Sequence, residues 1–291
     1  MTQRQKRIAV AGATGVLGLN VVPRLLEAGF EVRALVRSER HLALMRRLGA
    51  EAFVGDILAG ATLAPLLAGC DVALHLATAI PRDRRAPDWS VNDRIRREGT
   101  ANLVQACRTA CVRHYVQQSV AMLQASQGGA LTDESAPITA APNLRSAADM
   151  EAIVRESGIA WCILRGGWFY GPGTGLDAAW REQARRGELR IPGNGEALVS
   201  LVHVSDMAAA VVLAAQAGIQ GETLAIVDDA PVTWGELFQH VAAIEGQAPV
   251  KTDPALQPPL ASFRVSNARA RQRLNWAPFY RSYRSGLIAE R

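Results

Sequence analysis

The sequence predicts an α/β protein built on a doubly wound parallel sheet, and its element order and composition support this fold class. Short apolar segments alternate with helical stretches along the chain. The first, Ile8 to Ala11, is apolar without alternation, as expected for a strand buried on both faces. With 291 residues, 49% of them hydrophobic, the chain can bury a large core. We expect residues 1–165 to form the sheet domain, and residues 166–291 to form mainly a smaller, substrate-binding part.

A glycine-rich turn follows the first strand. Gly12, Gly15 and Gly18 are spaced as GxxGxxG, a helix with an apolar face follows them, and a second strand is expected over residues 31–36. Such glycines let the backbone approach a pyrophosphate, which then lies at the helix N-terminus, where free N–H groups favour an anion. The turn therefore predicts a Rossmann-type dinucleotide site. Its expected cofactor-binding residues are Gly12, Thr14, Gly15, Val16, Leu17 and Gly18.

The later elements continue the alternation. Helices are expected over residues 40–48, 61–67, 91–110 and 146–156, and strands over residues 51–56, 71–77, 114–120 and 159–165. The following loop, residues 166–175, is rich in glycine and aromatic residues, as ligand-binding loops at strand ends often are. A helix over residues 176–186 would cover it, and Ser205 or Asp206 is expected to cap a later helix.

The end of the second strand bears on which dinucleotide is preferred. An acidic residue there would bind the ribose 2′-hydroxyl of NAD, whereas an arginine can pair with the 2′-phosphate of NADP. Here Val36 is followed by Arg37, and no carboxylate occurs before Glu39. Arg33 and Arg40 could add to the positive field, although Arg33 could also point to the opposite face. The sequence predicts NADP(H).

Composition argues against several other classes of function. The net charge is +5, but the basic residues are spread along the chain and form no basic stripe interleaved with aromatic residues, so nucleic-acid binding is not expected. No apolar run is long enough to span a membrane, and the basic start leads into the first strand, so we expect a cytoplasmic protein. The five histidines form no ligand-spaced cluster, so no metal site is expected, and Cys107 and Cys111 are interpreted as a reduced core pair.

Several further motifs carry a family resemblance. They are Gly55-Asp56-Ile57, His75-Leu76-Ala77, the stretch ending GTANL at residue 103, LRGGWFYGPG at 164–173, LVHVSDMAAAV at 201–211 and SNARARQRLNW at 266–276. Together with the glycine turn, and in this order, they resemble the extended short-chain dehydrogenase/reductase family, in its NAD(P)-dependent epimerase/dehydratase branch. The resemblance covers nearly the whole chain.

The resemblance implies further cofactor contacts. They are Asp56 and Ile57 beside the adenine, Leu76, Ala77 and Thr78 beside the ribose and pyrophosphate, and Gly167 and Trp168 near the nicotinamide. The family's catalytic residues match only in part. Ser119 occupies the family's serine or threonine position at the end of the fifth strand. The family's Tyr-x-x-x-Lys pair falls at Asn143 and Ala147, and a shift of one residue does not restore it.

The missing pair limits the chemistry. Hydride addition to a carbonyl produces an alkoxide, and a general acid that protonates it typically contributes ~10²–10⁴-fold. We expect an NADP(H)-dependent reductase acting on a hydrophobic small molecule, with Ser119 as a candidate catalytic residue. Its proton donor would be displaced, to Tyr170, Asp149 or a water, or its acceptor would be an activated double bond. A non-catalytic NADP(H) sensor and an enzyme of redox-neutral elimination or cyclisation remain as alternatives, and the protein is expected to be a monomer or a homodimer.

Overall fold

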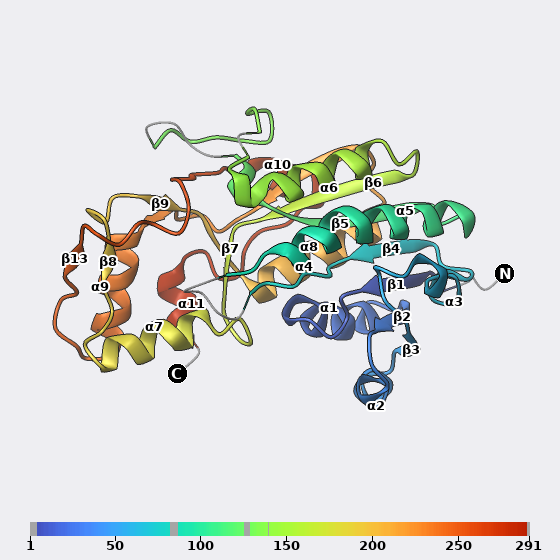
Figure 1. The fold of residues 1–291 in the computed structure, drawn as a ribbon, viewed down its shortest axis with the longest axis horizontal. Helices are drawn as coiled ribbons and strands as arrows, with labels where there is room; N and C mark the ends of the chain where they lie inside the picture. Colours follow the sequence, from blue (N-terminus) through green and yellow to red (C-terminus); the bar gives the residue numbers. More distant parts are fainter. Residues whose placement is uncertain (1–4, 82–86, 125–128, 139, 290–291) are drawn as a thin grey trace. The chain divides into compact units, whose positions relative to one another are not determined.

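The computed structural model describes residues 5–81, 87–124, 129–138 and 140–289. Its main element is a seven-stranded sheet with the order β11-β6-β5-β4-β1-β2-β3, flanked by helices (Figure 1). The strands are β1 (Arg7–Ala11), β2 (Glu31–Val36), β3 (Glu51–Val54), β4 (Val72–His75), β5 (His114–Val120), β6 (Ala160–Gly166) and β11 (Glu222–Ile226). Strand β1 pairs in parallel with both β2 and β4. The predicted doubly wound, Rossmann-type fold is confirmed.

The helices between these strands lie close to where the sequence predicts them. They are α1 (Val16–Glu27), α2 (Leu42–Arg47), α3 (Ala64–Leu67), α4 (Ser90–Arg94), α5 (Thr100–Thr109), α6 (Arg145–Arg155) and α8 (Val204–Ala217). Short 3₁₀ turns at 39–41 and 60–62 precede α2 and α3, so these two α-helices are shorter than expected. One apolar cluster joins α3, α5 and α6 to the sheet through Leu66, Leu103 and Val154, which pack with Ala9 and Ala73.

The helical stretch before β5 is irregular at its centre. The sequence predicts a long helix over residues 91–110, and the structure has a π-helical turn, Ile95–Gly99, between α4 and α5. A π turn widens the helix by one residue and is often found at functional sites. The turn brings Ile95, Arg96 and Gly99 into buried positions. The predicted long helix is therefore present, with a π-helical turn at its centre.

The chain divides into two compact units. The first contains residues 1–119, 140–164 and 208–223, and the second contains residues 120–139, 165–207 and 224–291. Outside the large sheet, the second unit forms the strand pairs β7 (Trp168–Tyr170) with β10 (Leu201–His203), β9 (Leu198–Val199) with β12 (Val232–Thr233), and β8 (Ile191–Pro192) with β13 (Thr252–Asp253). Its helices are α7 (Leu176–Arg185), α9 (Trp234–Ile244), α10 (Ala268–Leu274) and α11 (Tyr283–Ala289).

Two local predictions need correction. Cys107 is fully buried, but Cys111 lies beyond the end of α5, exposed and with a left-handed backbone (φ 56°), so the two cysteines do not form a core pair. Helix α8 already begins at Val204, which places Ser205 and Asp206 inside its first turn and not at its cap. The Asp206 carboxylate instead accepts hydrogen bonds from the backbone N–H groups of Phe279 and Tyr280, at 3.0 and 2.9 Å.

Candidate functional site

The glycine turn lies where the order of the sheet reverses. Strand β1 is flanked by β2 on one side and β4 on the other, and ligands of open α/β sheets bind at the carboxyl ends of such a strand pair. Gly12 follows β1 directly and has φ +90°. A Cβ atom on Gly12 would lie 2.5 Å from the backbone nitrogen of Ala77, just beyond β4. The two strand ends therefore approach so closely that only glycine fits.

The start of α1 presents backbone N–H groups without a side-chain cap. Gly15 is the N-cap residue, is exposed and makes no side-chain capping bond. A Cβ on Gly18 would lie 2.2 Å from the carbonyl oxygen of Gly12, so this glycine allows the helix to pack against the turn. Thr14 is half-buried, Val16 is 37% exposed and Leu17 is buried. These contacts form a glycine cradle with an open helix N-terminus, which fits the pyrophosphate of a dinucleotide.

The two arginines near the end of β2 have different surroundings. Arg33 is buried at 9% exposure, lies 3.1 Å from the Glu51 carboxylate through its Nε, and stacks on Phe53. Arg37 follows β2 directly and is exposed, and it has no ion-pair partner among the residues that the structure describes. Arg33 thus contacts its neighbours in the sheet, whereas Arg37 is accessible at the strand's carboxyl end, and Arg40 is exposed in the following 3₁₀ turn, Glu39–His41.

The segment after β3 is held in a tight turn. Asp56 is half-buried, and its carboxylate accepts a hydrogen bond from the backbone N–H of Leu58 at 2.9 Å. Ile57 is buried, and its carbonyl accepts a hydrogen bond from the Asn102 side chain at 3.0 Å. The Thr62 hydroxyl accepts from the backbone N–H of Asp56 at 3.0 Å. These bonds fix the backbone at the two residues that the resemblance assigns to the adenine.

The segment after β4 is fixed from both sides. The backbone N–H of Leu76 donates to the Ala11 carbonyl at 2.8 Å, and that of Ala79 donates to the Asn92 side-chain oxygen at 3.0 Å. Asn92 is fully buried, and its Nδ2 has no hydrogen-bond partner among the described residues. Burial lowers the pKa of His75 to about 4, so its ring is neutral near pH 7. Leu76 is buried, whereas Thr78 is exposed.

Ser119 belongs to a buried polar network. Its hydroxyl donates to the Glu151 carboxylate at 2.6 Å, and both side chains are almost completely buried. The other Glu151 oxygen lies 2.6 Å from the Arg155 guanidinium, which also contacts the Thr223 hydroxyl at 3.3 Å. Because the Ser119 hydrogen is already given to a carboxylate, the serine faces any further partner as a hydrogen-bond acceptor. The role of Glu151 as the partner of Ser119 could not be inferred from the sequence.

The positions that the resemblance assigns to the Tyr/Lys pair lie at the start of α6. Asn143 is exposed in a 3₁₀ turn, Pro142–Leu144, and Ala147 is fully buried in the first turns of the helix. Asp149, considered as a substitute acid, forms an ion pair with Arg97 at 2.7 Å. No tyrosine or lysine of the described residues adjoins Ala147 in the sequence.

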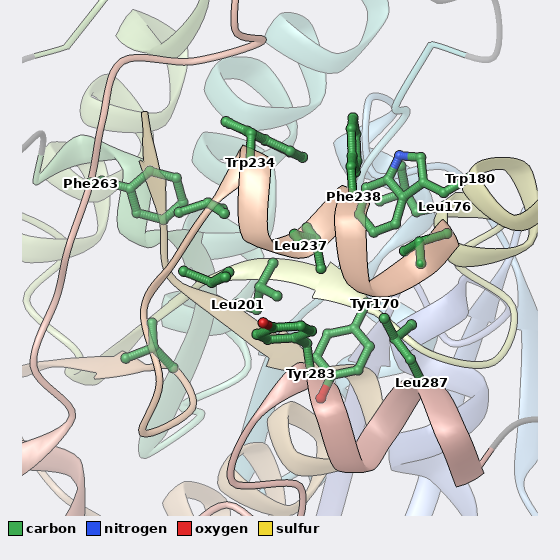
Figure 2. Close-up of a cluster of buried hydrophobic side chains, with 14 of the residues drawn as sticks. Tyr170, Leu176, Trp180, Leu201, Trp234, Leu237, Phe238, Phe263, Tyr283 and Leu287 are labelled. Atoms are coloured by element: carbon green, nitrogen blue, oxygen red, sulfur yellow. The ribbon is translucent and has the colours of Figure 1, made fainter. Parts of the chain in front are cut away.

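The residues that the sequence assigned to the nicotinamide side belong to the second unit. Tyr170 is fully buried in an apolar cluster with Trp180, Trp234 and Leu287, and its hydroxyl lies 3.4 Å from the carbonyl oxygen of Ser282 (Figure 2). The half-buried Trp168 packs edge-on against Trp234, with ring centroids 5.5 Å apart. In this structure the Tyr170 hydroxyl is enclosed, which disfavours it as a proton donor.

A Cβ on Gly167 would lie 2.6 Å from the carbonyl oxygen of Ser200, so a side chain at this position would collide with backbone.

Among the residues described, no group of three or more histidine, cysteine or acidic side chains could hold a metal ion. The same part of the chain forms no helix long and apolar enough to cross a lipid bilayer.

Comparison with known proteins identifies relatives over most of the chain. Residues 12–218 match the family model described as NAD(P)H-binding. A 3-diazoavenalumate denitrifying reductase from a Streptomyces species is 35% identical over 98% of this chain and 100% of its own length. A 4-hydroxy-2-methyl-3-oxo-4-farnesyl-3,4-dihydroquinoline-1-oxide ketoreductase from Stigmatella aurantiaca is 31% identical over 78% of this chain and 69% of its own length.

Solved structures agree on the fold. A UDP-glucose 4-epimerase from Thermotoga maritima superposes with a TM-score of 0.82 at 22% identity, covering 98% of this chain and 97% of the epimerase chain. This likeness shows a shared fold. Because residues 12–218 match its family model, the chain belongs to the NAD(P)H-binding family. The reductases among its relatives make it a reductase-like member of that family.

Proposed function

We propose that this protein is an NADP(H)-dependent reductase whose substrate accepts a hydride without needing a proton from a Tyr/Lys pair. The observation that carries the proposal is the altered catalytic face of α6. Asn143 and Ala147 stand where the pair would be, and the Ser119 hydroxyl gives its hydrogen to Glu151. A ketone reduced at this face would produce an alkoxide with no acid beside it.

The cofactor side supports this proposal through residues of the first unit. The glycine cradle at Gly12, Gly15 and Gly18 suits a pyrophosphate, and the fixed backbone at Asp56 and Ile57 suits an adenine. Arg37 is accessible at the end of β2, where it would pair with a 2′-phosphate. Bound NADPH would supply the hydride.

Aryl diazo compounds are the substrate class that best fits a site without an acid. In the balanced reaction, the hydride forms a C–H bond at the aryl carbon, the C–N bond breaks, N₂ leaves and the nicotinamide is oxidised. No proton is consumed when the substrate is the diazonium cation. The Streptomyces relative, at 35% identity, is named for a diazo compound, reduction and loss of nitrogen, which supports the same class here. The Ser119–Glu151 pair would also present an acceptor, not a donor, to a cationic group.

The test follows hydrogen from cofactor to product. The purified protein is mixed with an ortho-hydroxyaryl diazonium salt and NADPH that carries deuterium at the transferred position. We expect equal amounts of NADP⁺, N₂ and arene, with deuterium on the arene carbon. A simple aromatic ketone of similar size should be reduced far more slowly, because its alkoxide has no donor. The Gly12→Ala variant serves as the control for direct reaction between the diazonium salt and NADPH.

The opposite result would contradict the proposal. If the ketone were reduced at a rate typical of the family and the diazonium salt were not reduced above the Gly12→Ala control, a hidden proton donor would exist and the substrate class would be wrong. Tight NADPH binding without reduction of any acceptor would instead favour a sensor.

A further inference from the structure

Arg96 is a buried cation whose hydrogen-bonding groups are mostly unused. It lies on the π-helical turn between α4 and α5 and is only 6% exposed. A guanidinium has five N–H donors. Among the residues that the structure describes, Arg96 makes one hydrogen bond, from Nη1 to the Ser146 hydroxyl at 3.3 Å, and it forms no ion pair. Burial lowers its pKa, although the charge of nearby Asp93 opposes this effect.

Two other buried arginines of this chain, Arg33 and Arg181, are paired with carboxylates. Arg33 is 9% exposed and lies 3.1 Å from Glu51, and Arg181 is 8% exposed and lies 2.7 Å from Glu245. A buried charge without an anion is costly, so proteins usually pair it or use it to bind a ligand. Among the residues that the structure describes, Arg96 has only a neutral hydroxyl as its hydrogen-bond partner, and the nearby Asp93 carboxylate forms no ion pair with it. Its environment therefore indicates a binding role.

The position of Arg96 relates it to the altered face of α6. Its partner Ser146 directly precedes Ala147, the position of the family's lysine. The Ser146 hydroxyl donates to Asp93 at 2.6 Å, which leaves its lone pairs for Arg96 and fixes one end of the guanidinium. Each Arg96 nitrogen either has a hydrogen-bond partner or is accessible to solvent. The unused N–H groups of this buried side chain therefore reach a solvent-accessible space.

We propose that Arg96 is a ligand-binding residue that donates hydrogen bonds to an oxygen acceptor in the reductase site, replacing the positive charge absent at Ala147. The inference rests on the proposed function for the site's location. Two ligands of the site carry such an acceptor: the sugar hydroxyls of NADPH, and an oxyanion on the substrate, either carboxylate or phenolate. Both suit the planar, paired donors of a guanidinium.

The experiment separates binding from stability. Arg96→Met removes the charge and keeps an apolar side chain, and Arg96→Lys keeps the charge. Arg97→Met is the matched control, because Arg97 lies on the same turn but is 43% exposed and paired with Asp149. For each variant, the midpoint of thermal unfolding is measured without ligand. NADPH affinity is measured by tryptophan fluorescence without substrate, and KM is measured for two diazonium substrates, with and without a carboxylate.

We expect Arg96→Met to unfold at the same temperature as the natural protein or a higher one, because an uncompensated buried charge is removed. If the acceptor is on the cofactor, NADPH affinity falls about tenfold or more. If the acceptor is on the substrate, NADPH affinity is unchanged and KM rises. The rise is confined to the carboxylate-bearing substrate if the acceptor is the carboxylate, and it occurs with both ortho-hydroxyaryl substrates if the acceptor is the phenolate. In either case Arg96→Lys restores part of the effect, and Arg97→Met leaves both affinities as they were.

A structural arginine would give the reverse pattern. An unfolding temperature that drops in Arg96→Met, with NADPH affinity and both KM values unchanged, overturns the proposal. So does a protein that fails to fold as Arg96→Met but is fully active as Arg96→Lys with unaltered affinities. The NADPH titration needs no turnover, so it reports on Arg96 even if diazo reduction fails.

Discussion

The glycine turn and the start of α6 differ in how well each matches the pattern of the family that the sequence resembles. At the turn, the close backbone contacts require glycine. A Cβ atom added at Gly12 or at Gly18 would collide with neighbouring backbone atoms. At the start of α6, the resemblance assigns the family's two catalytic side chains to the positions of Asn143 and Ala147. In the function we propose, cofactor binding is retained while proton donation to the substrate has changed.

The same contrast appears in the polar groups. The turn exposes backbone N–H groups at the start of α1 without a side-chain cap, ready for an anion. Beside α6, polar side chains instead form hydrogen bonds with one another, Ser119 with Glu151 and Arg96 with Ser146. A substitution at the glycine turn would disturb the backbone, whereas the contacts beside α6 can be changed by replacing single side chains.

The largest effect is expected at Gly12. In Gly12→Ala the new Cβ would lie 2.5 Å from the Ala77 nitrogen, at a φ of +90° that L-residues rarely adopt. We expect NADPH affinity to fall by about 100-fold or more, since the cradle must open to remove the collision. Titration with NADPH measures the loss.

Gly29→Ala is the control for backbone strain alone. Gly29 has a similar φ of +84°, but no atom lies within 4 Å of its added Cβ. This variant should lose roughly 1 kcal/mol of stability and bind NADPH normally. Equal loss of NADPH affinity in both variants would mean that strain, and not the contact with Ala77, explains the result.

The next effect is expected at Glu151. Glu151→Ala leaves the Ser119 hydroxyl without its acceptor and removes the carboxylate that pairs with Arg155 at 2.6 Å. Breaking such a buried network typically costs about 3 kcal/mol of unfolding free energy. Urea denaturation measures it. Glu98→Ala removes the same type of i,i+4 pair on an exposed surface, with Arg94, and should cause no measurable change. Similar losses would show that burial does not decide the difference.

A smaller effect is expected at the end of β2. Arg37→Glu reverses the charge that would meet the 2′-phosphate, so NADPH affinity should fall about tenfold while NADH affinity changes little. The ratio of the two dissociation constants measures the preference. Arg47→Glu makes the same charge change on the exposed last turn of α2 and should leave the ratio unaltered. If Arg37→Glu weakened both cofactors equally, Arg37 would not contact the 2′-phosphate.

These two regions also differ in how much the sequence could predict. The turn was predictable because strand, glycine spacing and helix are local patterns, and β1 and α1 lie where they indicate. The contacts beside α6 were not predictable, because Ser119 and Glu151 are 32 residues apart and Arg96 and Ser146 are 50 apart. In a chain so rich in arginine, no local sequence pattern shows which individual arginines are buried. The π-helical turn that buries Arg96 also has no clear signal in the sequence.

The smallest effect is expected from restoring the family's pair. Asn143→Tyr with Ala147→Lys should increase the slow ketone reduction expected of the natural protein by a small factor, measured as NADPH oxidation with an aromatic ketone. The gain should stay below the ~10²–10⁴-fold of a complete general acid. Ala147 is fully buried, and the new lysine would compete with Arg96 beside Ser146. Adding Arg96→Met removes the repulsion between the two cations, so at saturating NADPH the triple variant should reduce a ketone without a carboxylate or phenolate faster than the double variant. A triple variant no faster than the double would show that Arg96 does not share the lysine's space.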